Sequence, residues 1–235
     1  MGVSIGSSIY NAPSIYESGA GGGGGDLEGD FGAGSISMPE GFTRLLYIEN
    51  NKISNIFRCN FDNLSISFDD DFLFSFKSPL FISDGDSFRP IGSNNTLNVG
   101  MRKRSYIGDK TRFEGGGNNF FYYAFEGNTN LDLSNVIIDL KMNKDGLYIN
   151  DEKIFNFAGP FDQSTRQQVY FPYQLGVDQK SSICQCYKFV IKNGDSIKYD
   201  FIPAKNENND VGFLDLVNEN FYAALNAIAG PDFPY

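Results

Sequence analysis

The sequence predicts an all-β protein, a sandwich or barrel of short strands, and two observations carry that prediction. The first is composition: the 235 residues include 23 Phe and 13 Tyr but no Trp, and Phe and Tyr favour strands. The second is patterning, because short alternating or aromatic stretches are separated by turn-forming Asp, Asn and Gly along most of the chain. No repeat of fixed period is visible, which disfavours a propeller or a β-helix.

The first 40 residues differ from the rest and predict a glycine-rich arm. Gly21 to Gly25 are consecutive, and such a segment is a flexible tether when it is free in water. Ordering it costs much conformational entropy, so we expect a partner surface, either a symmetry mate or a larger assembly, to supply the compensating contacts. The alternative is an arm folded back on its own domain. The side chains that could add an arm strand to a neighbour are Val3, Ile5, Ile9 and Tyr10.

Residues 41–235 are expected to form one β domain, and its strands can be placed in order. The two hairpins are predicted by the turn residues that separate their strands, Asn-Lys-Asp-Gly in the first and Lys-Asn-Gly-Asp in the second. In the tail, residues 218–229 are expected to form a short helical turn that Gly230 and Pro231 end. The expected strands are Phe42–Ile48, Leu64–Phe68, Phe72–Phe76, Leu97–Tyr106, Asn119–Phe125, the hairpin Val136–Met142 with Leu147–Ile149, and the hairpin Tyr187–Ile191 with Ile197–Ile202.

Charge limits the classes of partner. The net charge is −10 and the isoelectric point is near 4.5, which disfavours nucleic-acid binding and docking on anionic membranes. No secretory signal is visible, and no run of about 18 apolar residues occurs, so we expect no membrane span. One local exception is basic, and it is interpreted either as a solvated strand end with inter-strand ion pairs or as an anionic-ligand contact. Its residues are Arg102, Lys103, Arg104, Lys110 and Arg112.

The three cysteines, Cys59, Cys184 and Cys186, do not predict a disulfide framework, because their number is odd. Cys184 and Cys186 lie two apart in an expected strand, about 7 Å from one another on one face, too far for a relaxed disulfide. With no His in the chain, the usual zinc-ligand spacings are missing. We therefore expect reduced thiols and a protein made in a reducing cytoplasm.

The carboxylates do not predict an enzyme. A retaining glycosidase needs two of them about 5–5.5 Å apart, which the acidic residues of one strand face would supply, and no such string occurs. The absence of His excludes Ser-His-Asp and Cys-His arrangements. Asp69 to Asp71 are expected to form a solvated turn. Loop residues Asp84, Asp86 and Asp109 could bind Ca²⁺ but are interpreted as ordinary turn residues, so no metal or cofactor is expected.

The stretch Phe120–Phe125 is aromatic on both faces of an expected strand. One face must enter the core, and the other either meets a ligand or is buried by a second sheet or a trimer contact. Together with the basic stretch it supplies the candidate ligand-binding residues Arg102, Arg104, Tyr122 and Tyr123.

The C-terminal part carries a resemblance to a known family. CYKFVIKNGDSIKYDFIPAK begins at Cys186 and VGFLDLVNENFY begins at Val211. Both stretches resemble the end of the concanavalin A-like (laminin-G-like) domains of tailed-bacteriophage and prophage structural proteins. GFTRLLYIE at Gly41 and VGMR at Val99 resemble the opening and the centre of those domains. Phe213-Leu214 stands where the family usually has Met-Tyr, and the family's Gln-Tyr-Ile-Asp opening is absent.

The resemblance implies a two-sheet antiparallel jelly-roll sandwich in a non-enzymatic virion protein, made in the host cytoplasm. Such a protein would be a head-fibre, capsid-decoration or tail-fibre subunit, a homotrimer whose arm binds other virion proteins. The alternative is an adhesin that recognises a carbohydrate or receptor, for example a host-surface glycan. Asp200 and Asp215 stand where the family places Asp, and we expect them to accept backbone N–H groups and shape loops.

Overall fold

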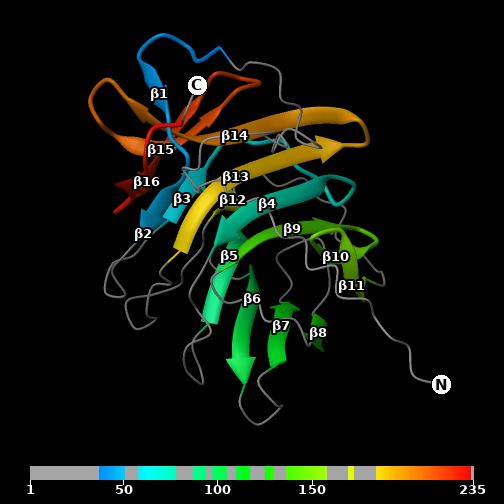
Figure 1. Cartoon of the computed structure of the whole chain (residues 1–235). Coiled ribbons are helices and arrows are strands. Elements are labelled where there is room, and N and C mark those ends of the chain that lie inside the picture. The colour runs from blue at the N-terminus through cyan, green and yellow to red at the C-terminus, as the bar shows by residue number, and fades with distance from the viewer. Residues whose placement is uncertain are drawn as a thin grey trace, which may run out of the picture. The chain divides into compact units, whose positions relative to one another are not determined.

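The structure, a computed structural model, describes residues 37–50, 58–77, 87–93, 97–104, 110–116, 125–129, 136–157, 169–171 and 184–233 (Figure 1). Met38–Tyr235 forms one unit of the chain. The described residues form strands, bridges and turns and contain no helix, so no membrane-spanning helix occurs among them. The predicted all-β class is confirmed for this part of the chain. Residues 1–36 of the predicted arm lie outside it.

The strands are short, as the alternating pattern and frequent turn residues predict. In chain order they are β1 (Phe42–Arg44), β2 (Ile48–Asn50), β3 (Arg58–Phe61), β4 (Asp71–Lys77), β5 (Ser87–Ser93), β6 (Leu97–Arg104), β7 (Lys110–Gly116), β8 (Phe125–Thr129), β9 (Ile137–Asn143), β10 (Gly146–Ile149), β11 (Glu152–Asn156), β12 (Val169–Tyr170), β13 (Cys184–Asn193), β14 (Ser196–Asn206), β15 (Val211–Asp215), β16 (Phe221–Leu225) and β17 (Ile228–Ala229).

Antiparallel pairing joins most of these strands into one continuous series. Its order is β11-β10-β9-β4-β13-β14-β15-β16-β3-β12-β5-β6-β7-β8. Figure 1 shows β9, β4 and β13 side by side. Both predicted hairpins are present, as β9–β10 and β13–β14.

Where β13 and β14 stop pairing with one another, each pairs with a short strand, β14 with β1 and β13 with β2. β14 pairs with β13 up to Phe201 and then with β1, whereas the start of β13 pairs with β2. β17 adds to the far side of β2. The last strand of the described globule, β17, therefore lies beside β2, one of its first two strands.

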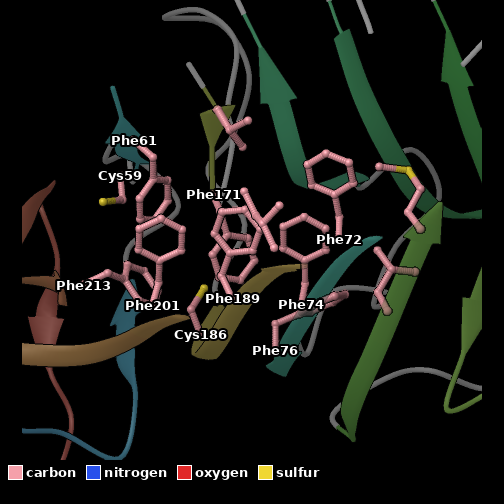
Figure 2. Close-up of a cluster of buried hydrophobic side chains, with 14 of the residues drawn as sticks. Cys59, Phe61, Phe72, Phe74, Phe76, Phe171, Cys186, Phe189, Phe201 and Phe213 are labelled. Atoms are coloured by element: carbon pink, nitrogen blue, oxygen red, sulfur yellow. The ribbon is translucent and has the colours of Figure 1, made fainter. Parts of the chain in front are cut away.

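The core is a stack of phenylalanines that alternation places on one face of each strand. Phe72, Phe74 and Phe76 of β4 are all buried, as their spacing predicts. Phe61 of β3 lies across the inner face of three other strands (Figure 2). Its ring centroid is 5.3 Å from that of Phe189 on β13, 4.4 Å from Phe201 on β14 and 5.6 Å from Phe213 on β15.

A second, smaller apolar cluster covers the opposite face of β14 and β15. Strand alternation points Ile202 and Ala204 away from Phe201, and Leu214 lies beside them. Met38 and Phe42, the first apolar side chains of the described globule, pack on this cluster together with Leu216 and Phe221. The chain therefore enters the globule across the outer face of β14–β15.

Three of the predicted secondary-structure elements need correction. Phe42–Ile48 is not one strand: it breaks at Leu45, which forms an isolated bridge to Asp232. Leu64–Phe68 forms no strand, although Leu64 and Ile66 are buried as the alternation suggests. The tail from 218 to 229 is not helical, because pairing of β16 with β15 and β3 and of β17 with β2 replaces the local helical preference.

Candidate functional site

Of the candidate ligand-binding residues, the structure places two. Arg102 and Arg104 lie on β6. Tyr122 and Tyr123 lie outside the described residues, as do the loop aspartates Asp84, Asp86 and Asp109 and the arm residues Val3, Ile5, Ile9 and Tyr10.

β6 and β7 are neighbouring strands (Figure 1), and their register brings the basic residues to facing positions. Arg102 pairs with Arg112, and Arg104 pairs with Lys110. Lys103, one residue away from both, pairs with Thr111. The expected inter-strand ion pairs therefore do not arise between directly opposite positions, where like charges are destabilising unless something neutralises them.

Register also sorts the residues of β5–β8 onto two faces. One face carries apolar positions, among them Phe88 paired with Met101, which in turn pairs with Phe113. The basic positions fall on the other face, where the next strands contribute Ser87 beside Arg102 and Asn128 beside Arg112. Farther along this face Glu114 pairs with Glu126, so charge changes sign along the strands.

Asp70 contradicts the predicted solvated turn and is fully buried. Its Oδ2 accepts hydrogen bonds from the Ser67 backbone N–H at 2.8 Å and from Lys198 Nζ at 2.8 Å. Its Oδ1 accepts one from Asn193 Nδ2 at 3.0 Å. The carboxylate thus fastens the loop before β4 to the β13–β14 hairpin, a partner some 120 residues away that local sequence does not reveal. Asp69, in contrast, is half exposed and pairs with Lys144 at 3.1 Å.

Asp215 fulfils the predicted loop-shaping role. Its Oδ1 accepts the backbone N–H groups of Asp200, at 3.1 Å, and of Val217, at 3.0 Å. Its Oδ2 accepts from Asn218 Nδ2 at 2.6 Å. These bonds hold the turn between β15 and β16, in which Glu219 adopts a φ of 56°.

Asp200 plays a different part from the one predicted. Its Oδ1 lies 3.3 Å from Lys188 Nζ but accepts no hydrogen bond from the described residues. Burial raises the pKa of Asp200 above its usual value, and the nearby Lys188 ammonium opposes that rise. The residue is thus the buried carboxylate of an ion pair, and Arg44 adds a second favourable charge interaction.

The three cysteines are buried free thiols, as expected. Sγ of Cys184 and Sγ of Cys186 are 4.0 Å apart, and Cys59 Sγ donates to the Tyr222 carbonyl oxygen at 3.3 Å. Burial raises the pKa of Cys59 and Cys186 well above the usual thiol value, which disfavours the reactive thiolate. Within the described ranges, no group of three or more Cys, Asp or Glu side chains is placed to hold a metal ion.

Comparison with known proteins adds no relative: neither a family model nor a curated protein matches the sequence. The fold and the residues above define an antiparallel all-β protein whose described buried carboxylates brace loops and hairpins. The arrangement with recognition chemistry is the facing basic positions of β6 and β7.

Proposed function

We propose that this chain is a non-enzymatic bacteriophage virion protein, a head-fibre, decoration or tail-fibre subunit with the β globule displayed outward. Its arm, residues 1–40, binds other virion proteins, the globule is a concanavalin A-like jelly-roll sandwich, and the subunits form a homotrimer. The observation that carries the proposal is the position of the segments that resemble the phage family. The opening segment supplies β1 and β2, which pair with β14 and β13 of the closing segment.

Ring packing between strands that do not pair with one another supports the sandwich. β3 contacts β13, β14 and β15 through rings rather than through backbone pairing, and Phe171, after β12, lies 5.1 Å from Phe74 of β4 between ring centroids. Two layers of sheet that share one aromatic core have this arrangement.

The junction between arm and globule supports an anchoring role for the arm. Met38 and Phe42 pack on Ile202, Ala204 and Leu214, and the Phe42 ring centroid is 5.4 Å from that of Phe221. A force applied to the arm would therefore be transmitted through Met38 and Phe42 to the outer face of β14–β15. This packing also shows where to cut: a deletion should end at residue 36 so that Met38 is retained.

An adhesin that recognises a host-surface glycan is the second candidate, and one observation favours it. The register sets Arg102 opposite Arg112 and Arg104 opposite Lys110. Like charges at facing positions destabilise a sheet, whereas an acidic ligand bound there would neutralise them. Both functions are compatible, because a displayed virion domain can also bind the host.

The test compares particles of the phage or prophage that encodes the chain, made with the full chain or with a chain lacking residues 1–36. We expect mass spectrometry to find the full chain in purified particles and to find the shortened chain only in the soluble fraction, still folded by circular dichroism. Particles without the full chain, or with both forms in equal amount, would refute the proposal.

A matched pair of arm variants sharpens that test. Ile5→Asp with Ile9→Asp places charge on the residues expected to add a strand, whereas Ser4→Asp with Ser8→Asp adds the same charge at neighbouring polar positions. The first pair is expected to abolish incorporation and the second to preserve most of it. Equal loss in both would assign the effect to charge alone and contradict strand addition.

A further inference from the structure

The strongest arrangement that the fold itself does not explain is the basic register of β6 and β7. Arg102, Arg104, Lys110 and Arg112 occupy two successive facing pairs on one face of two adjacent strands. Facing positions in an antiparallel pair are about 5 Å apart, and alternate positions along a strand about 7 Å. Four positively charged residues are thereby concentrated at adjacent backbone positions, in a chain whose net charge is −10.

We propose that this face of β6–β7 binds an anionic polysaccharide, one that carries carboxylate or phosphate groups along its length. The guanidinium of Arg is planar and bonds carboxylate or phosphate through two parallel N–H groups, which a Lys ammonium does not. Three of the four positions are Arg. The proposal names the ligand class of the displayed globule and so rests on the proposed function, but the two fail in different experiments.

The flanking strands favour a hydroxyl-rich ligand over a bare anion. In register with Arg102 stands Ser87 of β5, and in register with Arg112 stands Asn128 of β8. Ser and Asn side chains both donate and accept hydrogen bonds, as sugar hydroxyl groups do. The face thus combines a charged centre with neutral hydrogen-bonding residue types on either side.

The charge of the rest of the chain disfavours nucleic acid as the ligand. Duplex DNA carries one negative charge per ~1.7 Å of its axis and is usually bound by a broadly basic surface. On this same face Glu114 and Glu126 pair with one another, beyond the Arg102–Arg112 pair. A dense polyanion that extended along the strands would meet those carboxylates, whereas a sparsely charged chain that crosses the strands near Arg104 and Lys110 would not.

The strand alternation supplies a matched control. Lys103 lies between Arg102 and Arg104 but pairs with Thr111 and belongs to the opposite face. Arg102→Gln with Arg104→Gln should therefore weaken binding, whereas Lys103→Gln removes a positive charge from the same strand and should not. All variants are compared with the full-length wild type by thermal unfolding, so that a loss of fold is distinguished from a loss of binding.

The experiment is biolayer interferometry of the full chain against polygalacturonate, which carries carboxylates, and poly(glycerol phosphate), with neutral dextran and duplex DNA as comparisons. We expect saturable binding to at least one of the two anionic chains, weaker at higher salt, and no binding to dextran. The double Arg variant should bind at least tenfold more weakly, and Lys103→Gln should bind within twofold of wild type.

Several results would overturn the proposal. These are no saturable binding to either anionic chain at low salt, tighter binding to duplex DNA, or an equal loss in the Lys103→Gln and double Arg variants. If the double Arg variant does not fold, Arg104→Gln alone is measured against Lys103→Gln by the same criteria. None of these results changes particle incorporation, which tests the proposed function separately.

Discussion

The hairpin β13–β14 and the strand pair β6–β7 differ in which charges lie next to one another. Lys188 lies 3.3 Å from Asp200, and Lys198 lies 2.8 Å from Asp70, so these two lysines of the first region each meet a carboxylate. In β6–β7 the register sets positive residues against positive residues. The difference teaches that opposite charges brace the fold in the first region, whereas the like charges of the second region do not brace it and are the positions where we propose a ligand binds. The two regions should therefore respond to different experiments.

The largest effect is expected in the aromatic core that β3 forms with the hairpin β13–β14. Phe61→Ala removes a fully buried ring that contacts Phe189, Phe201 and Phe213, and should cost about 3–5 kcal/mol of unfolding free energy by leaving a cavity. Urea unfolding measures it. Val217→Ala, at a side chain that is 48% exposed, serves as the control and should change stability by less than about 0.5 kcal/mol. Similar costs for the two would contradict the assigned core.

The next effect separates two neighbouring aspartates. Asp70→Ala leaves Lys198 and Asn193 without their buried acceptor and should cost about 3 kcal/mol. Asp69→Ala breaks only a half-exposed ion pair with Lys144 and should cost less than about 1 kcal/mol. Denaturant unfolding of both variants under the same conditions measures the two losses of unfolding free energy. If Asp69 proved the costlier residue, the loop before β4 would be placed wrongly.

A smaller effect tests how closely β15 and β16 approach. A Cβ at Gly212 would lie 2.1 Å from the Tyr222 carbonyl oxygen, so Gly212→Ala must push the strands apart at a cost of about 2 kcal/mol. Gly194, in the β13–β14 turn, has open space around it but a φ of 58°, and alanine there should cost about 1 kcal/mol by backbone strain alone. Thermal unfolding ranks the two, and a neutral Gly212→Ala would contradict the β15–β16 pairing.

The smallest effect is a pH dependence. Because burial raises the pKa of Asp200, the folded state binds its proton more tightly than the unfolded state does. The unfolding free energy that this residue contributes therefore falls as pH rises through the folded pKa, and it is regained as pH falls toward the usual Asp value near 4.

Asp200→Asn isolates this contribution. Altering the contact with Lys188 changes the unfolding free energy by the same amount at each pH, whereas removing the carboxyl removes the part that depends on pH. Wild type should gain stability relative to the variant between pH 7 and pH 4 in urea unfolding experiments. A difference that stays constant over this range, or that changes in favour of the variant, would show that the Asp200 pKa is not raised.

Local pattern was enough to predict β4 and the hairpins β9–β10 and β13–β14. The spacing of Phe72, Phe74 and Phe76 predicts a buried face, and the turn residues around Gly146 and Gly194 predict both hairpins. The tail was predicted wrongly, because Phe221–Leu225 forms a strand only through its pairing with β15 and β3, which lie elsewhere in the sequence. Leu45 likewise breaks a strand through its bridge to Asp232.

The candidate site was predicted only in part. The basic stretch was visible in the sequence, but the facing of Arg102 with Arg112 depends on a register that strand content does not determine. The role of Asp70 was hidden for a similar reason. Its position three residues after Ser67 permits a local hydrogen bond, yet its burial depends on Asn193 and Lys198 from a distant hairpin.

The account depends most on two linked claims. The globule folds without its arm, and the arm binds the surface of another protein. Urea unfolding of the full chain and of the chain lacking residues 1–36, monitored by tyrosine fluorescence, tests this directly. Our account predicts one cooperative transition with the same midpoint in both chains, since Met38 and the outer-face cluster are retained. A shortened chain that is unfolded, or destabilised by more than about 2 kcal/mol, would show that the arm packs on its own globule and would contradict the account.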